Sequence, residues 1–189
     1  MADRDPAPHL RVDAARNRER LLEIAGRAFA AGIDPVSLEA IAREAEVGIG
    51  TLYRHFPTRE ALVEAVYRSE LADVCASAAP LLERLAPPEA LRAWMDRYAD
   101  FVRAKRGMAG LLGAMLSSGA IKQNETRARI DEALQSILDA GAETGSLRGD
   151  VPADDVATAL VGIFMATAKA DSREQADRLL DLLAESLRI

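Results

Sequence analysis

The side chains best suited to contact another macromolecule lie in one stretch, Ser37–Phe56, which reads SLEAIAREAEVGIGTLYRHF. Its first half has apolar residues at three- and four-residue spacing, namely Leu38, Ile41, Ala42 and Ala45. In the second half, Leu52 and Phe56 lie four residues apart and define an inner helical face. That leaves a set of residues on or near the outer face, namely Ile49, Gly50, Thr51, Tyr53, Arg54 and His55. Hydroxyl, guanidinium and imidazole groups of this kind can donate hydrogen bonds to phosphates and to base edges.

Two short helices joined by a tight turn would present this outer face. Ser37 is a suitable N-cap for the first helix, because its hydroxyl can accept a bond from a free amide. Val47 and Gly48 interrupt the apolar pattern, and we expect Gly48 to adopt the turn conformation that other residues disfavour. The second helix should begin near Ile49. This arrangement is a helix-turn-helix, whose second helix can enter the major groove of DNA.

The segment EAIAREAEVGIGTLYRHFPTREALVEAV resembles the DNA-binding signature of the TetR family of bacterial transcription regulators, of the TetR/AcrR type. The most specific part is TLYRHF, followed after a short link by the basic residue Arg59 and an apolar helix. The resemblance implies an all-α chain that binds double-stranded operator DNA as a homodimer and responds to a small molecule. It also implies that Tyr53 and His55 contact phosphates.

The expected DNA contacts divide into phosphate contacts and base contacts. Thr51, Arg43 and the helix start at Thr58–Arg59 suit phosphates, since free amides and a guanidinium meet there. Ile49 and the Thr51 methyl could touch thymine, and Arg54 could reach guanine or a phosphate. Glu39 could accept from cytosine or could simply be a solvated acid. The complete set expected at DNA is Ser37, Arg43, Ile49, Gly50, Thr51, Tyr53, Arg54, His55, Thr58 and Arg59.

Composition supports a helical chain but not a strongly basic one. The 189 residues are 49% hydrophobic and only 4% aromatic, which favours close-packed helices. The net charge is −6, yet residues 1–59 hold nine arginines and nine acidic residues and are neutral. We therefore expect few phosphate contacts and a shallow salt dependence. Because few polar side chains are placed to read bases, we also expect DNA shape to contribute appreciably to specificity. One cysteine, no apolar signal core and no membrane-length apolar run predict a cytoplasmic protein.

The remaining pattern predicts about nine helices in three parts. These are a flexible arm at 1–12, a helix-turn-helix DNA-binding domain at 13–58, and an effector-binding and dimerisation domain at 59–189. The expected helices span about 13–31, 38–45, 49–56, 59–77, 89–105, 107–116, 123–143, 152–169 and 172–187.

Two sets of apolar residues suggest binding surfaces in the larger domain. The first could line a cavity for a hydrophobic small molecule, although each member is more often plain core; it comprises Leu71, Cys75, Trp94, Tyr98, Phe101, Met108, Leu112, Met115 and Phe164. The second makes the last two helices apolar around most of their circumference, which favours a two-fold dimer over an intramolecular core alone. The expected dimer contacts are Val156, Leu160, Phe164, Leu179, Leu183 and Leu187.

These observations favour a ligand-responsive transcriptional repressor that is released from a palindromic operator by a small hydrophobic effector. The alternative is a small-molecule binding or scaffolding protein whose helix-turn-helix no longer binds specific DNA. The zero net charge of residues 1–59 and the sequence Gly48-Ile49-Gly50 keep that alternative open. An enzyme is not expected, because the sequence has no HExxH, GxSxG, CxxC, P-loop or GxGxxG motif. We likewise expect no catalytic residue, no metal and no cofactor.

Overall fold

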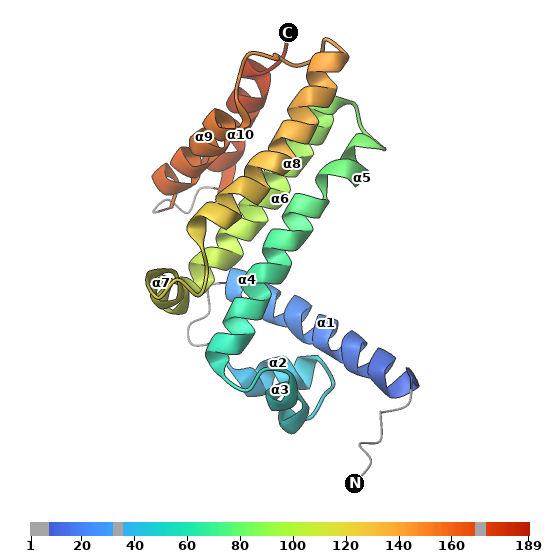
Figure 1. Ribbon diagram of the computed structural model, residues 1–189. Helices are drawn as coiled ribbons and strands as arrows, with labels where there is room; N and C mark the ends of the chain where they lie inside the picture. Colours follow the sequence, from blue (N-terminus) through green and yellow to red (C-terminus); the bar gives the residue numbers. More distant parts are fainter. Residues whose placement is uncertain (1–7, 32–35, 169–172) are drawn as a thin grey trace. The chain divides into compact units, whose positions relative to one another are not determined.

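The structure, a computed structural model, describes residues 8–31, 36–168 and 173–189, with side chains from residue 13 onward. Within these ranges the chain forms ten helices and no strand, apart from an isolated antiparallel bridge between Leu147 and Arg188 (Figure 1). The helices are α1 (Pro8–Ala30), α2 (Leu38–Glu44), α3 (Ile49–His55), α4 (Arg59–Ala76), α5 (Ala78–Leu82), α6 (Pro87–Gly107), α7 (Ala109–Ser117), α8 (Gln123–Glu143), α9 (Ala153–Ala166) and α10 (Arg173–Ser186). The all-α prediction is confirmed.

Two compact units make up the chain. The first contains residues 1–70 and 103–118, and the second contains residues 71–102 and 119–189. The boundaries therefore fall inside α4, inside α6 and just after α7. No helix in the described part of the chain is both long enough and apolar enough to cross a membrane.

The core of the first unit is formed where α1 meets α2, α3 and the first turns of α4. Leu21 and Ala25 of α1 and Leu52 of α3 are completely buried, and Phe56 is 2% exposed. α1 begins at Pro8, earlier than the expected start near residue 13. A proline is favourable in the first turn of a helix, because its missing amide would have no partner there. The rest of the expected arm, residues 1–7, lies outside the described residues.

The second unit packs α5, α8, α9, α10 and most of α6 together. Trp94, Leu134 and Leu160 are completely buried in its core. The guanidinium of Arg127 joins α8 to α9, since it donates to the carboxylate and backbone oxygen of Asp154. In the same unit, α6 is joined to α10 by the bond from Arg92 Nε to Asp181 Oδ1, at 2.6 Å.

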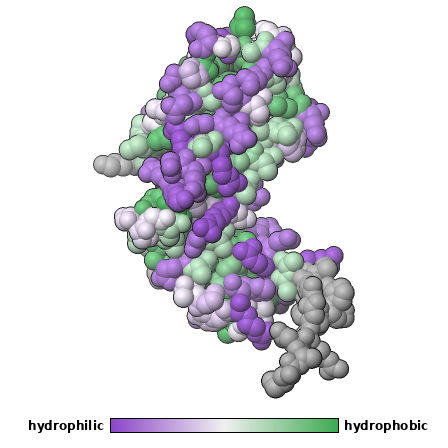
Figure 2. Space-filling model, in the orientation of Figure 1, coloured by the Kyte–Doolittle hydropathy of each residue, from purple (hydrophilic) through white to green (hydrophobic). Residues whose placement is uncertain are grey.

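The surface carries hydrophilic and hydrophobic residues intermingled on the face seen in Figure 2. Isolated exposed apolar side chains are normal on protein surfaces, whereas several on one helical face call for an explanation.

Candidate nucleic-acid interface

α2 begins with the cap that the sequence predicts. Ser37 Oγ accepts a hydrogen bond from the amide of Ala40 at 3.2 Å, which satisfies one free donor of the first turn. The same hydroxyl donates to Glu39 Oε2 at 3.0 Å. The pKa of Glu39 is lowered by a bond from its own backbone amide and then by this hydroxyl, so the residue is a carboxylate at neutral pH. Ser37 therefore has two local partners in addition to any contact with DNA.

The turn after α2 differs from the expectation at one residue. Gly48 has φ −67° and ψ 146°, an extended conformation open to any residue, and it caps α3. The left-handed residue is instead Glu46, with φ 55°. Its amide bonds to Arg43 O at 3.1 Å, and the Val47 amide bonds to Ala42 O at 3.0 Å. This bond pattern is a Schellman motif, in which the residue just past the helix end takes the left-handed conformation; that residue is usually glycine but here is a glutamate.

α3 spans Ile49–His55, as predicted, and presents one side to solvent. Leu52 is completely buried, whereas Ile49 and Tyr53 are 38% and 44% exposed. Gly50 and Arg54 are also exposed, and Thr51 and His55 are half-buried. A methyl group added at Gly48 or Gly50 would meet no atom within 4 Å, so the start of α3 has a low profile.

The arginines near α3 differ in whether they already have an acidic partner. Arg20 binds Glu46 at 2.7 Å, and Arg27 binds both Glu23 and Glu44. By contrast, the exposed guanidiniums of Arg43 and Arg54 form no hydrogen bond or ion pair within the described residues. Their charge is therefore available for an external anion.

Thr58 and Arg59 stabilise the helix-turn-helix domain itself. Thr58 Oγ1 accepts from the amide of Ala61 at 3.1 Å, which confirms Thr58 as the cap of α4. Arg59 Nη1 donates to the backbone oxygen of Val36 at 2.6 Å and is half-buried. Sequence reasoning missed this contact, because a bond between residues 23 positions apart leaves no periodic signal. Arg59 thus ties the start of α4 to the start of α2.

Comparison with known proteins identifies the helix-turn-helix. Residues 21–66 match the family described as "Bacterial regulatory proteins, tetR family". Residues 86–189, more than half of the chain, match "Transcriptional regulator SbtR-like, C-terminal domain". The chain belongs to the TetR family of transcriptional regulators.

Solved structures of other TetR regulators resemble this chain over almost its whole length. A TetR transcriptional regulator from Streptomyces coelicolor is 47% identical, with a TM-score of 0.83, and the match covers 90% of this chain and 98% of that one. A TetR regulatory protein from Mycobacterium vanbaalenii is 33% identical, with a TM-score of 0.74 and coverages of 95% and 99%. An HTH-type transcriptional regulator from Staphylococcus aureus is 41% identical over 63 residues, 33% of this chain. The match spans about a third (34%) of the length of the curated relatives.

The residues expected to bind an effector in this TetR regulator fall into both units. Trp94, Tyr98, Phe101 and Phe164 form an aromatic cluster in the second unit. The rings of Trp94 and Tyr98 are stacked with centroids 5.6 Å apart, and those of Phe101 and Phe164 both lie 5.9 Å from Tyr98. Trp94 Nε1 donates to the backbone oxygen of Val74 at 3.0 Å.

The other expected effector contacts are mostly buried as well. Leu71 is buried in the second unit, and Met108, Leu112 and Met115 are buried in the first. Cys75 is half-buried, and burial raises the pKa of its thiol, so the thiol is protonated at neutral pH.

The residues expected at the dimer contact of this TetR regulator need correction. Val156, Leu160, Phe164 and Leu187 are at most 6% exposed within their own chain and are therefore intramolecular core. Leu179 and Leu183 are half-buried. The sequence predicts that α9 and α10 are apolar on most of their surface. The helical period does not say which of these apolar residues pack inside the same chain and which remain exposed.

The apolar side chains that remain exposed on these helices are different ones. They are Val161 and Met165 on α9, at 37% and 74%, Leu182 on α10, at 67%, and Ile189 after it, at 82%. Exposed Gly162 lies between the two α9 residues, where an added methyl group would meet nothing within 4 Å.

Proposed function

We propose that this TetR regulator is a homodimeric repressor that binds a near-palindromic operator and is released by a small hydrophobic effector. The observation that carries the proposal is α3, whose Leu52 anchors it in the core while Ile49, Tyr53 and Arg54 face outward. A helix held in this way after a capped α2 has the shape of a recognition helix. Residues 13–58 would bind DNA, and residues 59–189 would bind the effector and dimerise.

In this proposal the residues of the head have separate roles at DNA. Ile49 and the Thr51 methyl touch thymine methyls, and Arg54 reaches a guanine edge or a phosphate. Tyr53, His55 and Arg43 contact phosphates, which set the register of the protein without reading sequence. Because Gly48 and Gly50 offer no side chain, base contacts are few and DNA shape supplies part of the specificity.

A dimer would use the exposed apolar face of α9 and α10. Val161, Gly162 and Met165 recur at helical spacing on α9, and Leu182 supplies a comparable exposed side chain on α10. A second copy that covers this face removes large apolar side chains from water, and a two-fold axis lets both copies use the same surface. Two recognition helices would then reach successive major grooves about one helical turn, ~10 bp, apart.

The effector would act through the buried aromatic cluster of the second unit. A hydrophobic molecule that inserts beside Trp94 and Tyr98 must displace packed side chains, so binding and conformational change are coupled. A coupling free energy of about 1–3 kcal/mol would change operator affinity roughly 5- to 150-fold. Trp94 is the only tryptophan, so its fluorescence reports such binding directly.

The test of DNA binding is a shift assay with DNA from upstream of the protein's own gene. Arg54→Gln and Tyr53→Phe should both weaken specific binding. If Arg54 contacts a phosphate, its loss should also make the slope of log K against log salt shallower by about 0.9, whereas loss of the uncharged Tyr53 hydroxyl should leave the slope unchanged. Arg84→Gln is the matched control, because Arg84 is an exposed arginine of the second unit. Variants of Arg59 are unsuitable here, since they also remove the bond to Val36.

The competing function is a small-molecule binding protein whose head no longer recognises DNA. The low profile at Gly48 and Gly50 is the observation in its favour. Under that function Arg54→Gln would leave all DNA binding as weak as in the parent chain, while ligands would still change the fluorescence of Trp94.

A further inference from the structure

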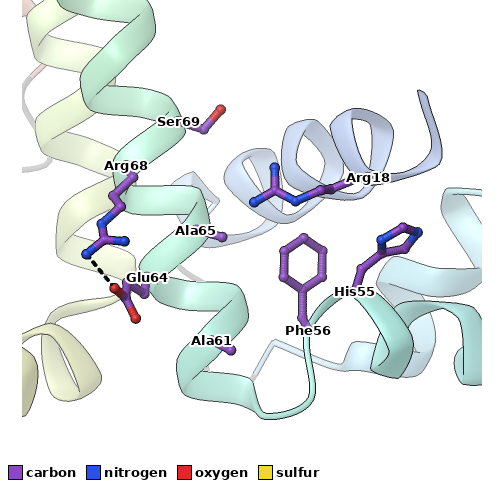
Figure 3. A pocket seen from close by; sticks show the side chains of 8 residues that line it. All are labelled: Arg18, His55, Phe56, Ala61, Glu64, Ala65, Arg68 and Ser69. Carbon is purple, nitrogen blue, oxygen red and sulfur yellow. Dashed lines mark ion pairs between the residues drawn. The ribbon is translucent and has the colours of Figure 1, made fainter. Parts of the chain in front are cut away.

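A hollow of about 380 Å³ opens in the first unit between α1, the end of α3 and α4 (Figure 3). On the α4 side, three small residues at helical spacing, Ala61, Ala65 and Ser69, leave the space. Arg18 of α1 and His55 of α3 lie across from them. Side chains from α1 and from the consecutive helices α3 and α4 therefore line one space.

The cationic groups of the hollow are only partly neutralised. The guanidinium of Arg18 lies 5.4 Å from the centroid of the Phe56 ring, and no carboxylate contacts it within the described part of the chain. The His55 ring lies 6.2 Å from the Phe56 ring between centroids and forms no hydrogen bond or ion pair within the described residues. The one acidic group of the lining, Glu64, is bound by Arg68 at 2.7 Å.

This balance distinguishes Arg18 from two other arginines on α1. Arg20 and Arg27, which lie on the same helix, both form ion pairs, at 2.7 Å to Glu46 and Glu23 respectively. Arg18 instead packs against an aromatic ring at the edge of the hollow, and its guanidinium forms no hydrogen bond or ion pair within the described residues. A guanidinium is the side chain that most readily binds phosphate through two parallel bonds.

We propose that this hollow is an anion-binding site that takes a phosphate group between Arg18 and His55. On the α4 side, Ser69 adds a hydroxyl to the lining that forms no hydrogen bond within the described residues. A bound phosphate would connect α1, α3 and α4 and so fix the recognition helix against its two supports.

The phosphate could belong to a free small molecule or to the backbone of DNA beside the operator half-site. The first source requires no DNA binding, whereas the second rests on the proposed function. Two separate measurements on the full-length chain distinguish these sources.

The first measurement is a titration with inorganic phosphate at constant ionic strength, followed by the ring-proton NMR signals of the two histidines. His55→Gln assigns the signals, and sodium chloride is the matched salt. We expect a saturable shift of the His55 signal alone. Arg18→Gln should weaken phosphate binding about tenfold or more, because it removes a charge-assisted hydrogen bond. Ala65→Leu, which fills the hollow without changing charge, should abolish the shift.

Ala72→Leu is the control for a larger side chain on α4. Ala72 is half-buried like Ala65 but does not line the hollow, so this variant should bind phosphate as the parent chain does. A shift that persists equally in Arg18→Gln and Ala65→Leu would overturn the site.

The second measurement is the salt dependence of operator binding. If the phosphate belongs to DNA, Arg18→Gln should make the negative slope of log K against log salt shallower by about 0.9, while Arg84→Gln leaves the slope unchanged. If the phosphate is free, the slope stays the same and inorganic phosphate still shifts the His55 signal. No saturable shift together with an unchanged slope would refute the proposal. A parent chain that ignores DNA but binds phosphate would refute only the proposed function.

Discussion

Replacing Gly107 by alanine should destabilise the first unit, because the end of α6 lies directly against the backbone of α1. An ideal Cβ at Gly107 would lie 1.9 Å from the carbonyl oxygen of Phe29 and 2.6 Å from its carbonyl carbon. Carbon–oxygen contacts are normally about 3.3–3.6 Å. The two helices must therefore separate by about 1.4 Å or more, and Phe29, which is 2% exposed, must leave its packed position.

The expected magnitude follows from two opposing effects. Overpacking a core costs about 1–3 kcal/mol, and alanine gains up to about 1 kcal/mol over glycine in a helix. A net loss of about 1–2 kcal/mol should lower Tm by roughly 2–8 °C in a chain of this size. Thermal unfolding followed by circular dichroism measures this shift.

Gly110→Ala and Gly113→Ala are the matched controls, since both glycines lie on the neighbouring α7 and an added Cβ meets nothing within 4 Å. These variants should be as stable as the parent chain or slightly more stable. A Gly107→Ala variant with an unchanged Tm would show that the close approach of α6 to α1 does not exist in solution.

Four further predictions concern single residues. Glu46→Gly should raise stability by about 0.5–1 kcal/mol in urea unfolding, because glycine adopts the left-handed conformation without strain and the ion pair with Arg20 that is lost is exposed and contributes little; a loss of stability would contradict this. Gly162→Ala should stabilise the monomer by up to about 1 kcal/mol yet raise the dimer dissociation constant in sedimentation, and an unchanged dissociation constant would exclude α9 from the interface. Lys105→Met should stabilise the chain most at neutral pH. Burial lowers the pKa of Lys105, so the free-energy cost of burying its charge is present below the lowered pKa and disappears as the pH rises through 10.5. An equal gain in stability at neutral pH and above pH 10.5 would contradict this. The hydrogen bond from Arg188 lowers the pKa of Glu89 below 4.5, so the stability that this bond contributes is present above pH 4.5 and lost as the pH falls through the lowered pKa. Arg188→Gln should therefore remove this loss of stability at acid pH when Tm is measured as a function of pH.

Local signals in the sequence predicted the helix-turn-helix closely. The cap at Ser37, the break after Ala45 and the spacing of Leu52 and Phe56 each depend on residues within one or two turns of one another. Such contacts are encoded in short patterns, so the bounds of α2 and α3 and their buried faces could be read directly. The residue with the left-handed backbone could not be predicted in this way. Glycine favours that conformation, which suggested Gly48, but the position just past the end of α2 is occupied by Glu46.

Contacts between distant residues were beyond the reach of the sequence. The bond from Arg59 to Val36 and the approach of Gly107 to Phe29 join helices whose packing no local pattern specifies. The same limit applies to α9, where Leu160 and Met165 both belong to one broad apolar stripe. Only the packing of the second unit makes the first completely buried and the second 74% exposed.

The most direct test of a dimeric operator-binding repressor is the stoichiometry and specificity of its complex with DNA from upstream of its own gene. Sedimentation of the parent chain with that DNA should give two chains per near-palindromic site, and competitor DNA of scrambled sequence should not displace them. A stable monomer, or a complex that scrambled DNA competes away equally well, would contradict the account.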